Sequence, residues 1–377
     1  MSGRTKRVFR ITAAAAAVAA ATLAAVATSA SGRAEPATNA GAAATKPKVA
    51  IITLYREPLA QNMAAGARLA AQEVGADFHW QGPPGLNPPA EVKMLQDEIA
   101  AGTKGIVLMM YPPDLFNRPI KQATDQGVTV VTLDVGAMDS TATTHLGPGK
   151  RELGIAEARV LAKRLGKNAK GYIQPGICVP GLDVLEAPFT GLEGALKKLT
   201  PGVEMKEALN VTGDPATNFT AWQRIIAQNP NALAFVGNCD QDAPNLIKIK
   251  QSTRNAKFLI GDTSGDGIAV LKAVKSGTMD VIIGQSGFVQ GYVGMKLVLE
   301  KLIKNKTIPK GWLDVGVETI TKKNADAAIK VRQQLAAGNL KAGYKYYKRA
   351  ILRTLKITPT GIGASYTRQK LNPLVTP

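Results

Sequence analysis

Two short apolar runs in this chain each end at a carboxylate. One covers residues 130–133 and leads into Asp134, and the other covers residues 258–261 and leads into Asp262. Continuous apolar runs are typical of buried strands in parallel sheets, and ligands of open α/β sheets sit beyond the carboxyl ends of such strands. An ionised carboxylate accepts several hydrogen bonds, so it suits a ligand with adjacent hydroxyl groups. We therefore expect the two strand ends to face each other across a cleft between two domains.

The spacing of apolar residues predicts two successive series of alternating strands and helices, beginning at residue 48. In the first series the expected elements are, in chain order, 49–54, 60–74, 77–81, 91–101, 106–110, 115–126 and 128–133. In the second series they are 151–165, 171–174, 189–199, 204–211, 219–228, 233–236, 244–251, 257–260, 267–275, 279–283, 289–304 and 313–321. Strand–helix–strand units with short connections require parallel sheets with right-handed crossovers. The expected fold class is α/β, with two flavodoxin-like βα domains.

Sequence motifs for the common hydrolytic, phosphate-binding and dinucleotide-binding chemistries are missing. There is no Gly-x-Ser-x-Gly elbow, no Gly-x4-Gly-Lys-[Ser/Thr] loop and no Gly-x-Gly-x-x-Gly fingerprint. His79 and His145 have no cysteine or carboxylate neighbour in a triad-like pattern, and the cysteines and histidines lack a zinc spacing. We expect a protein that is not an enzyme and needs no cofactor and no metal, with an exported enzyme as the lower-ranked alternative.

Residues 1–30 have the pattern of a secretory signal peptide. Four basic residues near the N-terminus precede an Ala-rich apolar stretch over residues 11–27, and small-residue cleavage sites follow. Residues 31–47 have the composition of a disordered leader. We expect the signal peptide to be cleaved and the protein to lie in the periplasm or outside the cell.

An exported protein can hold a disulfide, and this chain has two cysteines, Cys178 and Cys239. They lie just past two expected strands, 171–174 and 233–236. If those strands are neighbours, as the first and third strands of a flavodoxin-like sheet are, the cysteines can bridge. If the strands are apart, both cysteines stay free, and the spacing alone does not choose between these outcomes.

The chain is strongly basic, with a net charge of +19, and part of this charge is concentrated near the C-terminus. Residues 327–377 contain ten basic residues and no acidic one. One interpretation is a polyanion-binding tail in which Tyr344, Tyr346 and Tyr347 act as stacking groups. The other, which we favour, is a solvated extension that stays against the cell envelope or the body of the protein. A further alternative is that these tyrosines and Ile351 pack across the domains and regulate their closure. We expect no nucleic acid as a partner of an exported chain.

Several of these segments, taken in order, resemble the type I periplasmic binding proteins, the ribose- and galactose-binding group that feeds ABC transporters. The similar segments are 49–54 with the turn at Pro58, 105–108 with the turn at 112–114, 128–134, 234–240, 259–262 and 283–285. The resemblance covers about residues 48–326. It implies a clamp of two lobes that closes on a small sugar or polyol by a hinge motion and then meets an ABC permease in the membrane, with a monomer as the working form.

The resemblance also implies where the lobes divide. The N-terminal lobe would contain residues 48–148 and 286–312, and the C-terminal lobe residues 149–285 and 313–330. Residues 331–377 would form a basic C-terminal extension.

Residue by residue, the strand-end carboxylates match the family's ligand contacts. Asp134 matches a hydroxyl-accepting aspartate, and Asp262 matches the aspartate after the fourth strand of the second domain. Asn238 or Asp240 matches the polar group after that domain's third strand, and Gln285 matches a contact at a crossover. A turn or helix-cap role is the alternative for each aspartate.

The sequence departs from the pentose and hexose binders at three places. Val135 and Gly191 stand where those proteins have arginines, and residues 59–60 replace an aromatic pair that sandwiches a sugar ring. Tyr55 and Arg56, just upstream, are the remaining candidate contacts there. We therefore do not expect a pyranose held by stacking and two arginines, and a small polyol or modified sugar is the expected ligand.

Two further segments, 81–84 and 144–150, look more like the branch of the family that binds rhamnose or autoinducer-2. The resemblance thus leaves an alternative function open. The protein would then be a periplasmic sensor that binds a sugar derivative or autoinducer-type molecule and signals to a membrane receptor.

Overall fold

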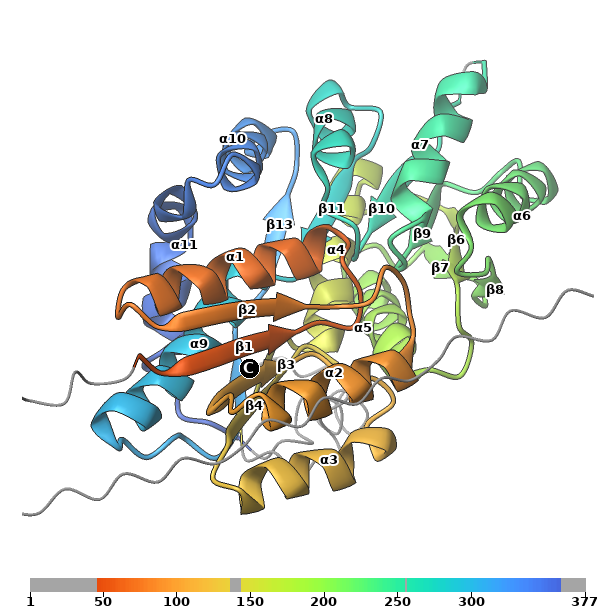
Figure 1. Ribbon diagram of the computed structural model, residues 1–377. Helices are drawn as coiled ribbons and strands as arrows, with labels where there is room; N and C mark the ends of the chain where they lie inside the picture. Colours follow the sequence, from red (N-terminus) through yellow and green to blue (C-terminus); the bar gives the residue numbers. More distant parts are fainter. Residues whose placement is uncertain (1–45, 136–143, 255, 361–377) are drawn as a thin grey trace, which may run out of the picture. The chain divides into compact units, whose positions relative to one another are not determined.

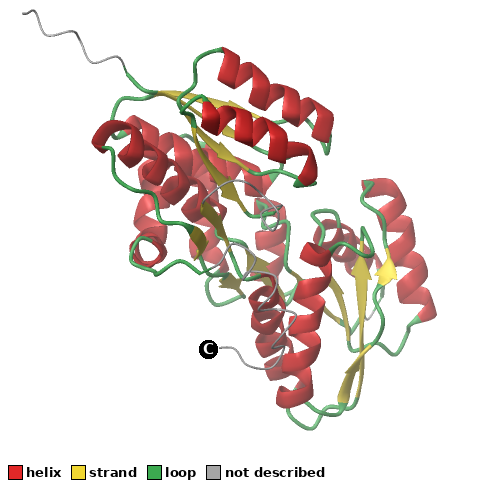
Figure 2. Cartoon of the chain, turned by 90° about the horizontal axis from the view of Figure 1, so that it is seen from below, coloured by secondary structure: helices red, strands yellow, loops and turns green. Residues whose placement is uncertain are grey.

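The computed structural model describes residues 46–135, 144–254 and 256–360 (Figure 1). The expected signal peptide, most of the expected leader and the last residues of the basic C-terminal region lie outside these residues. In the described part, the strands form two sheets that are flanked by helices (Figure 2).

The first sheet is entirely parallel. Its strands lie in the order β12 (Gly311–Asp314), β5 (Thr144–Gly147), β4 (Thr129–Leu133), β3 (Gly105–Leu108), β1 (Lys48–Ile52) and β2 (Asp77–Gln81). Successive side chains point to opposite faces. Val49 and Val107 pack with α1 (Pro58–Gln72) and α9 (Gly287–Lys304), whereas Ile52 and Ile106 pack with α2 (Pro88–Ala100) and α3 (Asp114–Asp125). Both faces are buried, which explains the continuous apolar runs.

The second sheet is parallel except at one edge. Its order is β13 (Glu318–Ile320), β11 (Val281–Gly284), β10 (Leu259–Asp262), β9 (Ala234–Gly237), β6 (Gly171–Ile177) and β7 (Val203–Met205), with β8 (Leu209–Asn210) paired to β6. Only β13 runs antiparallel to its neighbour, β11. One face is covered by α4 (Lys150–Leu165) and α5 (Asp183–Leu199). The other is covered by α6 (Pro215–Gln228), α7 (Asp242–Ser252), α8 (Ile268–Ser276) and α10 (Ala325–Ala336).

Helix α9 follows a strand of the second sheet but packs onto the first. Two glycines allow it to approach α1 closely. A Cβ at Gly66 would lie 2.2 Å from the carbonyl oxygen of Phe288, and one at Gly291 would lie 1.9 Å from that of Met63. Any larger residue at either position would push the helices apart, so this contact fixes the place where the chain returns to the first sheet.

The predicted α/β fold class is confirmed, but the single last strand expected at 313–321 is wrong. That region forms two strands, β12 in the first sheet and β13 in the second. A turn separates them: Gly316 has φ +70°, and its N–H donates to the Asp314 carboxylate at 2.7 Å. The chain therefore crosses between the sheets within this stretch. Strand β5 was not among the expected elements, because it is only a short segment before α4.

The basic C-terminal region is folded as far as it is described, so the expectation of a solvated extension is wrong for this part. It forms α10 and α11 (Leu340–Thr354). Helix α10 contacts α8, while α11 contacts α1 and α9. Tyr347 and Ile351 of α11 are buried in the same hydrophobic cluster as Phe288, whose ring stacks on Tyr347 at 5.6 Å. The two helices therefore contact the cores of both sheets.

Candidate functional site

Asp134 lies at the end of β4, where the backbone turns sharply. Its φ is +59°, and its N–H donates to the carbonyl of Leu146 at 2.7 Å. The carboxylate is almost fully buried and accepts a hydrogen bond from the ammonium group of Lys150 at 2.7 Å. Positive φ is uncommon for a residue with a side chain, and here it accompanies a buried charge.

Lys150 connects Asp134 to the crossover after β11. It is the first residue of α4, it is also buried, and its Nζ donates to the side-chain oxygen of Gln285 at 3.0 Å. Gln285 in turn donates to the carbonyl of Thr263, at 3.2 Å, in the loop after β10. The chain Asp134–Lys150–Gln285 therefore joins the ends of strands from both sheets.

The sequence did not single out Lys150 as a site residue. The segment 144–150 was expected only to resemble one branch of the family, without a role for any single residue in it. The available signal was a lysine just before the expected helix 151–165, but its pairing with Asp134 depends on how β5 leads into α4.

Asp240 and Asp262 share one serine. Ser264 donates its backbone N–H to Asp262 Oδ1 and its hydroxyl to Asp240 Oδ1, both at 2.6 Å. Burial, together with the charges of Glu57 and Asp266, raises the pKa of Asp240 to about 6. Two of the predicted aspartates are thus brought together by the loop after β10.

Asp262 is fully buried, and its Oδ2 has no partner among the described residues. Burial and the nearby acidic groups of Asp242, Glu157 and Asp240 raise the pKa of Asp262 well above its usual value. A carboxyl group that is protonated can donate a hydrogen bond as well as accept one, and the raised pKa of Asp262 favours that form.

Tyr55 lies among carboxylates from both sheets. Burial, followed by the charges of Asp240, Asp134 and Glu57, raises the pKa of Tyr55 well above 10. Its hydroxyl therefore stays protonated. The predicted residues Tyr55, Asp134 and Asp240 are near enough to interact electrostatically, although they lie far apart in the sequence.

The two remaining predicted contacts are already engaged by the protein. Arg56 donates to the carbonyl of Gly82 at 2.6 Å, and its guanidinium lies 5.8 Å from the centre of the Trp80 ring. The amide of Asn238 donates to the carbonyl of Leu185, and its backbone N–H donates to Asp242 at 3.1 Å. These contacts shape the loops beside the site.

The turn after β9 is held by a disulfide and by the buried side chain of Asp242. Cys178 and Cys239 are bridged, with Cα atoms 6.3 Å apart, and β6 and β9 are neighbouring strands. Asp242 accepts hydrogen bonds from Asn218 and Trp222, both at 2.8 Å, and from two backbone N–H groups of this turn. The disulfide and Asp242 therefore fix the loop that carries Asp240.

Each of the two histidines contacts a polar side chain of its own sheet region. Burial and the charge of Lys150 lower the pKa of His145 to about 3, and its Nδ1 shares a hydrogen bond with Thr132 at 3.1 Å. His79 is 3.2 Å from Glu98. Over the described ranges, no cluster of His, Cys, Asp or Glu side chains is arranged to bind a metal ion.

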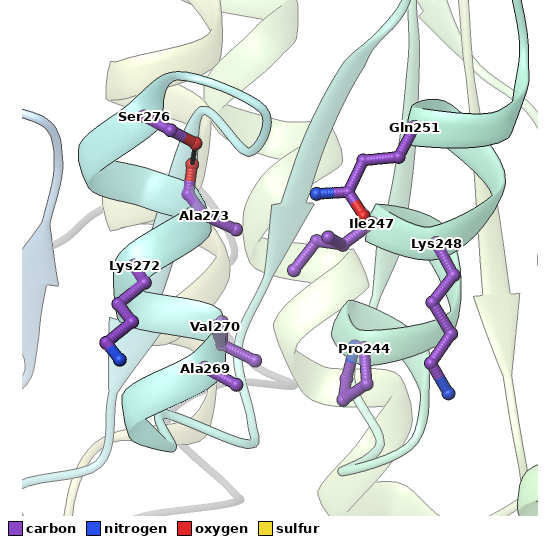
Figure 3. A pocket seen from close by; sticks show the side chains of 9 residues that line it. All are labelled: Pro244, Ile247, Lys248, Gln251, Ala269, Val270, Lys272, Ala273 and Ser276. Carbon is purple, nitrogen blue, oxygen red and sulfur yellow. Dashed lines mark hydrogen bonds between the residues drawn. The ribbon is translucent and has the colours of Figure 1, made fainter.

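A groove of about 430 Å³ lies elsewhere, between α7 and α8 (Figure 3). It is lined mainly by apolar groups such as Ile247, Val270 and Ala273, with Lys248 and Lys272 beside it. Ser276 is occupied by a hydrogen bond to the carbonyl of Ala273 at 3.0 Å. The groove contains none of the strand-end carboxylates, so it is distinct from the site described above.

Polar side chains that converge from the carboxyl ends of parallel strands define an α/β ligand-binding protein. Residues 49–306 match the family model of the periplasmic binding protein domain, and the chain belongs to this family of binding proteins. The expected family is therefore confirmed.

Two relatives have low sequence identity to this chain, but the similarity extends over most of its length. The chain is 24% identical over 223 residues to the ribose import binding protein RbsB of Haemophilus influenzae. The aligned region covers 59% of this chain and 74% of that protein. It is also 23% identical over 260 residues to RbsB of Salmonella typhimurium, and that aligned region covers 68% of this chain and 85% of the relative.

Two solved ABC transporter solute-binding proteins share the fold. The protein from Burkholderia graminis, in complex with D-arabinose, gives a TM-score of 0.66 at 23% identity over 74% of this chain and 96% of that chain. The protein from Agrobacterium vitis, bound with alpha-D-tagatopyranose, gives a TM-score of 0.67 at 24% identity over 76% of this chain and 98% of that chain.

Among the described residues of the present chain, no helix combines the length and apolarity needed to cross a bilayer.

Proposed function

We propose that this exported protein captures a small sugar or polyol at the converging strand ends and delivers it to an ABC importer. The observation that carries the proposal is the buried chain Asp134–Lys150–Gln285, since it joins both sheets beside Tyr55 and Asp240. Family membership and the sugars named for the relatives support the ligand class.

In this proposal Lys150 and Asp134 act together on the ligand. A lysine ammonium has three donor hydrogens, and Lys150 uses two of them on Asp134 and Gln285. The third can donate to a ligand oxygen, while Asp134 Oδ2 accepts from a hydroxyl. Lys150 would thus supply the cationic donor that Val135 cannot provide.

The second sheet supplies a matching set of groups. Asp240 offers a carboxylate oxygen that is not used by Ser264, and Asp262 offers Oδ2. Tyr55 adds a protonated hydroxyl from the first sheet. Arg56 and Asn238 would support the loops rather than bind the ligand directly.

We further propose a clamp of two lobes, each built on one sheet. Sheet membership supports an N-terminal lobe of residues 48–148 and 286–314, with α11 packed onto it, and a C-terminal lobe of residues 149–285 and 315–338. The chain would work as a monomer without a nucleic-acid partner, and its importer partner would be the membrane permease.

A thermal-shift screen tests the proposed function. The chain without its signal peptide would be heated with D-ribose, D-arabinose, D-allose, D-tagatose and several polyols, and with amino acids as the comparison set. We expect at least one sugar or polyol to raise the melting temperature, because a ligand at 100 times its Kd adds about 2.7 kcal/mol of stability. A response to amino acids alone, or to nothing in the panel, would contradict the proposal.

A further inference from the structure

Helix α11 has one buried face and one basic face. The buried face consists of Gly343, Tyr347, Ile351 and Thr354, which pack toward α1 and α9. The exposed positions of the opposite face are Lys341, Lys345, Lys348, Arg349, Leu352 and Arg353, with Lys356 just beyond the helix. At about 100° per residue, the six helical positions fall within an arc of about 140°.

The charges of this basic face have no counter-charge in the described part of the chain. None of its lysines or arginines forms an ion pair with another described residue. Exposed lysines on other helices do pair with an acid one turn away, as in Lys93 with Asp97, Lys121 with Asp125 and Lys197 with Glu193. Like charges at this spacing destabilise a helix, so the basic face is not explained by the stability of α11.

Acidic groups on the neighbouring elements are engaged elsewhere. Glu73 of α1 accepts from Tyr292, and Glu300 of α9 is paired with Lys296 and Lys306. Glu318 of β13 is bound by Arg332, Tyr346 and Tyr347. The basic face is therefore left to attract an external anion.

The tyrosines of the segment do not reach this face as free stacking groups. Tyr347 is buried, the Tyr346 hydroxyl is bonded to Glu318, and the Tyr344 ring lies 5.3 Å from that of Tyr292. Binding of single-stranded nucleic acid relies on such stacking platforms. The basic face does expose one large apolar side chain, that of Leu352, which is 43% exposed.

We infer that the basic face of α11 docks the protein onto an anionic phospholipid surface. Lysine and arginine side chains on one face of a helix are attracted to anionic headgroups, and an apolar residue among them can enter the boundary between headgroups and acyl chains. The inference does not depend on which solute the protein binds. It gives the protein a second surface, separate from the strand ends, that would hold it against the bilayer in a defined orientation.

Vesicle co-sedimentation of the chain without its signal peptide tests this inference. The probes are phosphatidylglycerol vesicles and neutral phosphatidylcholine vesicles at low salt and at about 1 M salt, where the Debye length is about 3 Å. We expect binding to phosphatidylglycerol alone and release at high salt. Equal binding to both vesicle types, or binding that persists at high salt, would overturn the inference.

Two triple variants separate the basic face from the total charge. One carries Lys345→Gln, Lys348→Gln and Arg349→Gln, and the matched control carries Lys93→Gln, Lys121→Gln and Lys197→Gln. All six side chains are exposed, so both proteins should fold, and their melting temperatures check this. We expect the first variant to bind phosphatidylglycerol vesicles about a hundredfold more weakly and the control to bind nearly as the wild type. Equal losses in the two variants would overturn the inference.

Leu352→Ser distinguishes a bilayer from a soluble polyanion. If a membrane is the partner, this variant should bind vesicles several-fold more weakly and bind polyphosphate or poly(U) as the wild type does. If Leu352→Ser leaves vesicle binding unchanged while the Gln variant loses polyphosphate or poly(U) binding, the partner is a polyanion and the bilayer proposal is wrong.

Discussion

At the scale of single residues, the strand-end carboxylates could be predicted and their partners could not. Asp134, Asp240 and Asp262 follow apolar runs, and the topology of parallel sheets places such ends together. Lys150 and Asp242 follow no such rule. Each depends on a hydrogen bond to a residue or turn that only the folded chain brings near, so neither spacing nor residue type revealed them.

Glu157 is a third residue that could not be predicted from the sequence. It lies on α4, fully buried, and neither carboxyl oxygen has a partner among the described residues. A Cβ at Gly261 of β10 would lie 2.3 Å from its Oε1, so the side chain fits against the sheet only because residue 261 is glycine. Burial raises the pKa of Glu157 to about 8.

This pKa predicts a pH-dependent stability. Between about pH 4.5 and pH 8 the folded protein keeps the Glu157 proton while the unfolded chain has lost it. The contribution of the Glu157 proton to the free energy of unfolding is therefore complete below about pH 4.5. It falls by about 1.4 kcal/mol per pH unit as the pH rises toward 8. We expect Glu157→Gln to be more stable than the wild type at about pH 8 and to lose this advantage at about pH 5.

Urea unfolding at the two pH values measures the effect. Glu193→Gln is the control, since Glu193 is on the neighbouring helix α5 and its side chain is partly exposed and paired with Lys197. If Glu157→Gln and the wild type show the same change in unfolding free energy between the two pH values, the assigned protonation of Glu157 is wrong.

At the scale of elements, the strongly periodic helices and buried strands were predictable, and β13 and α11 were not. The stretch 313–321 was expected to form one strand because its sequence is strand-like on both sides of Gly316, and the turn at this single glycine was not recognised. Helix α11 reads as solvated because its buried face holds only two large nonpolar side chains, Tyr347 and Ile351. Contacts from outside the helix, above all with Phe288, make that face part of the core.

Two adjacent residues of α11 test whether the helix belongs to the core. Ile351 is fully buried and Leu352 is 43% exposed. Ile351→Ala should lower the free energy of unfolding by about 2–5 kcal/mol because it leaves a cavity in the packed cluster. Leu352→Ala should change it by less than about 0.5 kcal/mol. Equal, small effects in chemical denaturation would show that α11 is not part of the folded core.

At the scale of the whole molecule, the C-terminal helices connect the loop beside the site to the core of the first sheet. The Arg332 guanidinium of α10 contacts Asp266, which follows Asp262 by four residues, and Glu318 at 2.9 Å. Glu318 also accepts hydrogen bonds from Tyr346 at 2.6 Å and Tyr347 at 2.8 Å. The match to the family model ends at residue 306, so every residue of this connection except Asp266 lies beyond that match.

We propose that one solute is held by strand ends from both sheets. Tyr55→Phe removes a donor on the side of the first sheet, and Asp240→Asn removes a charged acceptor on the side of the second. Isothermal titration with the tightest-binding sugar or polyol from the thermal-shift screen measures both variants against Asp214→Asn, a change at an exposed helix cap.

We predict one binding site per chain in the wild type and in the control. The control carries the same Asp→Asn change as Asp240→Asn but lies at the start of α6. We expect Asp240→Asn to bind at least about tenfold more weakly, because hydrogen bonds to a charged group contribute about 1.5–3 kcal/mol, and Tyr55→Phe to lose several-fold in affinity. Unchanged affinity in either variant would show that the ligand is not held between the two sets of strand ends and would contradict the account.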